Sequence, residues 1–134
     1  MIQQPVFLYI EDDQLSREVM AMLLQGLGYS QLTMFEDSVD FMARIEALPA
    51  VPDVIFLDIH MKPHNGFEML KTLREHPTLA SKIVIAITAS VMNEEVAQLR
   101  QAGFNGAIGK PLDYENFALL MERVLKGEAV WHIA

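Results

Sequence analysis

Short runs of apolar residues alternate along this chain with longer segments in which apolar residues recur every three or four positions. A short apolar run between turn-forming residues is typical of a strand buried on both faces, and the wider spacing is typical of an amphipathic helix. The runs predict five strands: Pro5–Ile10, Leu32–Phe35, Val54–Asp58, Lys82–Ile87 and Gly106–Ile108.

Five helices are predicted between and after these strands. Glycine stands where two of them end, and aspartate or serine stands where two others begin. The predicted helices run over Gln14–Leu27, from Asp37 or Ser38 to Leu48, from Asn65-Gly66 to His76, over Asn93–Ala102, and from Asp113 to Lys126. The side chains expected to face the core are Leu15, Val19, Met22, Leu23, Leu27, Phe41, Ile45, Leu48, Phe67, Leu70, Leu73, Tyr114, Phe117, Met121, Val124 and Leu125.

The alternation of strand and helix, five times over, predicts an α/β fold with a doubly wound parallel sheet covered by helices on both faces. Residues 1–127 are expected to form this domain. Residues 128–134 are assigned to a C-terminal tail, which carries the single tryptophan and has no predicted element.

The composition narrows the class of protein. The 134 residues suffice for one domain with its own core, and no apolar run approaches the ~20 residues that cross a bilayer. The lack of cysteine excludes a disulfide framework and thiolate chemistry. The net charge of −8 disfavours direct contact with nucleic acid. With no signal-peptide pattern at the start, we expect a cytoplasmic protein.

Polar side chains stand at the carboxyl ends of four predicted strands. Glu11 and Asp12 follow the first, Asp58 ends the third, Thr88 follows the fourth, and Lys110 follows the fifth. Each of them alone also fits a helix cap, a turn or a solvated charge. Together they indicate a binding site, because open parallel sheets bind their ligands at the carboxyl ends of the strands.

The chemistry of these groups is coherent. Crowded carboxylates repel one another unless a cation lies between them, and hard oxygen ligands suit Mg²⁺. A carboxylate beside Mg²⁺ can attack phosphorus and become an acyl phosphate. An ammonium group and a hydroxyl can then stabilise the phosphoryl oxygens, so the residues fit phosphoryl transfer.

With these residues in this order, the chain resembles the response-regulator receiver domains of two-component signalling, in particular the single-domain type of the chemotaxis regulators. The resemblance runs from about Val6 to Leu125. Its segments are Phe7-Leu8-Tyr9-Ile10-Glu11-Asp12-Asp13, Asp58-Ile59-His60-Met61 with Pro63 and Gly66, Ile87-Thr88-Ala89, and Gly109-Lys110-Pro111.

The resemblance implies a flavodoxin-like fold with strand order 2-1-3-4-5. It implies that Asp58 accepts a phosphoryl group from a sensor histidine kinase or a histidine phosphotransfer protein, and that Lys110 and Thr88 bind that group. It also implies a cis peptide before Pro111. The implied Mg²⁺ ligands are Asp12, Asp58, the backbone carbonyl of His60 and, mostly through water, Glu11.

Two departures from the family pattern stand out. The family usually has Tyr or Phe three residues before the lysine as a rotamer switch, and here that position is Ala107. The loop proline is Pro63, one place later than usual, with Lys62 in its slot. His60 and Ser90 occupy the positions at which the family tunes dephosphorylation.

The sequence leaves three classes of function open. The first is a stand-alone switch that catalyses only its own phosphorylation and dephosphorylation. It would signal by protein contact, to a downstream target or in a homodimer, through Asn93–Ala102, the fifth strand and Asp113–Lys126. The second is a binding module that no longer switches, which Ala107 favours and the complete site disfavours.

The third class is an enzyme or cofactor carrier on the same fold. The acidic Glu11-Asp12-Asp13 would repel the phosphate of a flavin cofactor, and Asp58 does not begin the Asp-x-Asp motif of an aspartyl phosphatase. Both observations argue against this class.

Overall fold

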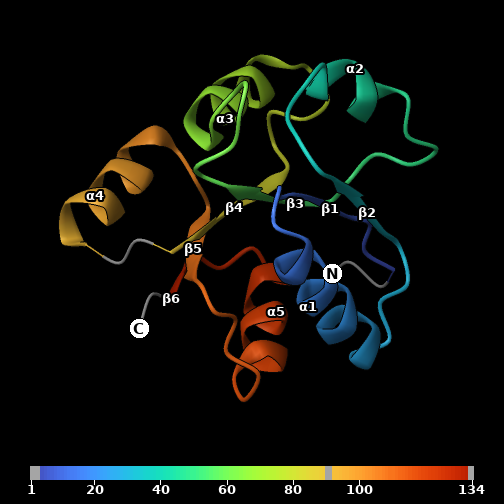
Figure 1. Cartoon of the computed structure of the whole chain (residues 1–134), viewed down its shortest axis with the longest axis vertical. Helices are drawn as coiled ribbons and strands as arrows, with labels where there is room; N and C mark the ends of the chain where they lie inside the picture. Colours follow the sequence, from blue (N-terminus) through green and yellow to red (C-terminus); the bar gives the residue numbers. More distant parts are fainter. Residues whose placement is uncertain (1–3, 90–91, 133–134) are drawn as a thin grey trace.

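Six parallel strands form one sheet in the part of the chain that the structure describes, residues 4–89 and 92–132 of a computed structural model. Their order across the sheet is β2-β1-β3-β4-β5-β6 (Figure 1). The strands are β1 (Phe7–Ile10), β2 (Leu32–Phe35), β3 (Val54–Asp58), β4 (Ile83–Thr88), β5 (Gly106–Gly109) and β6 (Val130–His132).

Helices cover both faces of the sheet, as the doubly wound prediction requires. One group of helices lies on one face and a second group lies on the opposite face (Figure 1). The first group is α2 (Phe41–Glu46), α3 (Gly66–Glu75) and α4 (Asn93–Ala102), and the second is α1 (Gln14–Gly26) and α5 (Phe117–Leu125). No helix in residues 4–89 and 92–132 is both long enough and apolar enough to cross a membrane.

Neighbouring residues of each strand enter different cores. Leu8 and Leu57 pack with α2, α3 and α4, whereas Tyr9 and Phe56 pack with α1 and α5. Successive side chains of a strand point to opposite faces of the sheet. Because both faces are buried here, successive residues within a central strand have to be apolar. This is why the central strands appear in the sequence as continuous apolar runs.

The strand order 2-1-3-4-5 is confirmed, and the structure adds a sixth strand. Residues 130–132, assigned to a tail, pair in parallel with Gly106, Ala107 and Ile108 of β5. Three residues are too few for periodicity to distinguish a strand from a loop. The last two residues of the tail, 133 and 134, lie outside the described residues.

The predicted buried face of α1 is wrong in part. Leu15 and Met22 are 66% and 54% exposed, whereas Met20 and Leu24 are fully buried. Val19 and Leu23 pack against the core at its edge, and Leu27 is exposed. The helix is rich in Leu and Met on several sides, so spacing alone does not select the stripe that meets the sheet.

Two predicted helix starts also shift. The second helix begins after Asp40, not after Asp37 or Ser38, and Ser38 is buried with its hydroxyl bonded to the backbone of His64. Asp113 does not cap α5 directly: it accepts backbone N–H bonds from Glu115 and Asn116 in the turn before the helix.

The later start of α5 leaves Tyr114 58% exposed rather than buried. By contrast, Asn65 caps α3 as predicted, in a capping box with Glu68.

Met20 and Met22 test the corrected face of α1, because they are the same residue type two positions apart. We expect Met20→Ala to lower the free energy of unfolding by about 2–5 kcal/mol, since it opens a cavity in the core. Met22→Ala should change it by less than about 0.5 kcal/mol. Urea unfolding of the two variants measures both, and equal losses would contradict this packing.

Candidate functional site

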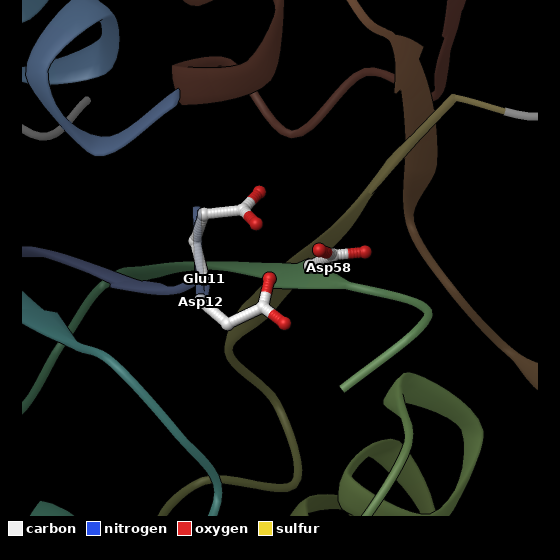
Figure 2. A group of neighbouring side chains, drawn as sticks. All are labelled: Glu11, Asp12 and Asp58. Carbon is white, nitrogen blue, oxygen red and sulfur yellow. The ribbon is translucent and has the colours of Figure 1, made fainter. Parts of the chain in front are cut away.

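Three carboxylates meet at the carboxyl edge of the sheet. Glu11 and Asp12 directly follow β1, and Asp58 is the last residue of β3, which pairs with β1 in the register Ile10 to Leu57. One carboxylate oxygen from each of the three lies within 4.8 Å of the others (Figure 2). The register of β1 and β3 therefore brings these three residues together, as the sequence predicts.

Lys110 supplies the positive charge that this group of acids needs. Its ammonium nitrogen lies 2.5 Å from Glu11 Oε1 and 3.3 Å from Asp58 Oδ2. Burial lowers the pKa of Lys110, but the hydrogen bond to Glu11 and the charges of Asp58 and Glu11 outweigh it, and the net shift is upward. The lysine is therefore a permanent cation at neutral pH.

Glu11 is the most deeply held of the three acids. Its side chain is fully buried, and it accepts hydrogen bonds from the Tyr9 hydroxyl at 2.7 Å and from the Asp13 backbone N–H at 3.1 Å. Burial and the neighbouring Glu11 raise the pKa of Tyr9. Sequence reasoning missed Tyr9, although its spacing of two residues from Glu11 in an extended segment was the available signal.

Asp12 differs from Glu11 because it is exposed to solvent. Desolvation, together with a hydrogen bond and the charge of Glu11, raises its pKa above the ordinary value. A raised pKa means that its charged form is disfavoured where it stands. An exposed carboxylate under repulsion from its neighbours is suited to bind a cation.

Asp58 is held at both oxygens. Its carboxylate is nearly buried, its Oδ1 accepts the His60 backbone N–H at 3.0 Å, and its Oδ2 faces Lys110. Thr88 is the buried last residue of β4, which lies between β3 and β5, and its backbone carbonyl accepts the Lys110 N–H at 2.8 Å. The five side chains predicted to form the site thus gather at the carboxyl ends of the strands.

The loops around the site contain two cis peptides, Lys110-Pro111 as predicted and also Lys62-Pro63. Ser90, which stands at a position where the family tunes dephosphorylation, lies outside the described residues. Ala107 is fully buried in β5, where its neighbour across the sheet is Trp131 of β6.

Replacement of Asp12 tests the repulsion in the acid group. A folded-state pKa raised above 3.8 means that stability is lost as pH rises through this range. Asp12→Asn should therefore be more stable than the parent at pH 7 in EDTA, by less than about 1 kcal/mol because the group is exposed and screened. Thermal unfolding at pH 7 and below pH 3.8 measures the difference, which should vanish at the lower pH.

Three comparisons place these features among known proteins. The sequence model of the family described as "Response regulator receiver domain" matches residues 7–122. The stress response regulator protein 1 of Meyerozyma guilliermondii is 30% identical over 110 residues, which are 81% of this chain and 50% of that protein. The chain thus spans half the length of this relative.

The polar-differentiation response regulator DivK of Brucella ovis is 29% identical over 112 residues, covering 81% of this chain and 85% of that protein. Among solved structures, the chemotaxis response regulator CheY4 of Vibrio cholerae superposes with a TM-score of 0.80 at 24% identity. The alignment covers 91% of this chain and 99% of CheY4. At this identity the likeness concerns the fold.

The family match extends from β1 into α5 and so includes every element that carries a site residue. With a doubly wound sheet and an acidic group at its carboxyl edge, the chain belongs to the response regulator receiver domain family.

Proposed function

We propose that this receiver domain accepts a phosphoryl group on Asp58 from a phosphohistidine donor, in a reaction that requires Mg²⁺. The observation that carries the proposal is the position of the Asp58 carboxylate, which lies 3.3 Å from the Lys110 ammonium group and within 4.8 Å of carboxylate oxygens of Glu11 and Asp12. A histidine kinase or a histidine phosphotransfer protein would be the donor.

Asp58 is prepared to act as a nucleophile. The His60 N–H holds one oxygen in place, so the carboxylate does not rotate freely, and the other oxygen faces Lys110. In the transfer, an Asp58 oxygen forms a bond to phosphorus, and the bond between phosphorus and the donor imidazole nitrogen breaks. The electron pair of that bond returns to the imidazole.

The acid group fits the requirements of Mg²⁺, which takes one or two carboxylates and keeps several waters. Asp12, Asp58 and the His60 carbonyl would hold the ion, and Glu11 would act mostly through water. Bound there, Mg²⁺ would neutralise charge on the phosphoryl oxygens. Lys110 is already a cation beside Asp58 and would bind the same oxygens, as would the Thr88 hydroxyl.

The contacts of Lys110 suggest how the site communicates with the rest of the domain. Its side chain binds Glu11 and Asp58, while its backbone N–H binds the carbonyl of Thr88. A phosphoryl group on Asp58 would draw both Lys110 and Thr88 toward it. Thr88 is the last residue of β4, and Lys110 directly follows β5. We propose that the signal leaves through the face of α4, β5 and α5 to a protein partner.

Intact mass after incubation with Mg²⁺ and a small acyl-phosphate donor tests this function. We expect one phosphoryl adduct on the parent and none on Asp58→Asn, because the amide is not a nucleophile. Asp40→Asn is a matched control, since Asp40 is an exposed aspartate and Asn also tolerates its left-handed backbone. It should be modified like the parent. EDTA should abolish the adduct.

The absence of both adduct and Mg²⁺ binding would contradict the proposed reaction and favour a binding module that does not switch. An adduct that persists in Asp58→Asn would place the acceptor elsewhere. Isothermal titration with Mg²⁺ separates the loss of metal binding from the loss of transfer.

A further inference from the structure

The sixth strand occupies the edge of the sheet that β5 would otherwise expose. Val130, Trp131 and His132 pair in parallel with Gly106, Ala107 and Ile108. The two backbones are in close contact at Gly106, where an added Cβ would lie 3.0 Å from the Val130 nitrogen and closer still to its carbonyl oxygen. Only glycine at position 106 therefore admits the strand.

The side chain of each β6 residue contacts a different part of the domain. Val130 is fully buried in the core shared with α1 and α5. Trp131 packs at the edge of the opposite core, and the guanidinium of Arg100 on α4 lies 4.5 Å from its ring centroid. His132 Nε2 lies 3.1 Å from Asp113 Oδ2, in the loop that follows Lys110.

The attachment is nevertheless limited in extent. The strand has three residues, and the segment from Lys126 to Ala129 that leads to it is exposed. Besides the core packing of Val130 and Trp131, its side chains contact two groups near the surface, Arg100 and Asp113, and such contacts contribute little each. The tether itself does much to hold β6 in place, because a linked segment has an effective concentration of about millimolar.

We propose that the β5 edge is a strand-binding site, and that the chain's own segment 127–132 is a detachable occupant that competes with a protein partner for it. The groups that contact β6 define the chemistry of the partner. It is an extended segment with a small aliphatic residue, then an aromatic residue, then a hydrogen-bond donor. The aliphatic residue enters the Val130 position, the ring stacks on Arg100, and the donor reaches Asp113. This extends the proposed output face, of which β5 is a part.

Binding in trans tests the proposal without any phosphoryl donor. The probe is a fluorescein-labelled peptide of residues 127–132, and the receptor is the full chain carrying Val130→Asp, whose own strand should leave the edge because a buried carboxylate is costly. Fluorescence anisotropy should show that the peptide binds the Val130→Asp chain saturably. Its affinity for this chain should be at least about tenfold higher than for the parent chain, in which β6 already occupies the β5 edge. A peptide with the same Val130→Asp change should bind neither chain.

Gly106→Ala is a second variant that blocks the edge from the other side. Gly106→Ala should release Trp131, the only tryptophan of the chain. Quenching of the tryptophan fluorescence by acrylamide should therefore rise severalfold. This variant should also fail to bind the peptide. Gly26→Ala is the matched control, because an added Cβ there meets nothing within 4 Å, and its quenching should equal that of the parent.

Equal peptide affinity of the parent and Val130→Asp, or unchanged quenching in Gly106→Ala, would overturn the proposal. Loss of cooperative unfolding in either variant would also overturn it, because β6 would then be an integral part of the core. None of these results depends on Asp58, so a failure here is distinguishable from a failure of the phosphorylation test.

Discussion

The contact on which the rest of this structure depends is that of one ammonium group with two buried carboxylates. Glu11 is completely inaccessible to solvent and Asp58 nearly so, and Lys110 lies within ion-pair distance of both. A buried charge without a partner is strongly destabilising, so the acids and the lysine require one another. The ion pairs join residues more than fifty positions apart, at the ends of β1, β3 and β5.

This requirement explains the surroundings of the site. The Tyr9 hydroxyl and the Asp13 N–H satisfy Glu11, and the His60 N–H satisfies one oxygen of Asp58. Asp12 alone of the three acids remains open to solvent, with its pKa raised. The site therefore combines a rigid, fully paired interior with one accessible carboxylate, an arrangement that leaves an attractive position for a cation.

The sixth strand places an aromatic residue beside Ala107 of β5. Ala107 is small, and the neighbouring strand brings Trp131 beside it, where Arg100 of α4 covers the indole ring. An aromatic side chain is thus present next to this position of β5, but it comes from a different strand. His132 meets Asp113, three residues after Lys110, so the strand also touches the loop that leaves the site.

Much of this architecture was determined by the sequence by itself. Continuous apolar runs such as Val54–Leu57 are buried on both faces wherever they lie in a parallel sheet, and an acid directly after such a run must stand at the sheet edge. The strands, the order 2-1-3-4-5 and the meeting of Glu11, Asp12, Asp58, Thr88 and Lys110 follow from that local rule and from the family pattern.

Only the tertiary structure decided which sides of the helices are buried and where the tail lies. Helix α1 carries apolar residues on several sides, and contact with the sheet selects Met20 and Leu24 over Leu15 and Met22. The strand at Val130–His132 exists because β5 offers an unpaired edge and Gly106 allows close approach. Both outcomes depend on surfaces formed by distant residues, and no periodicity within a short segment encodes them.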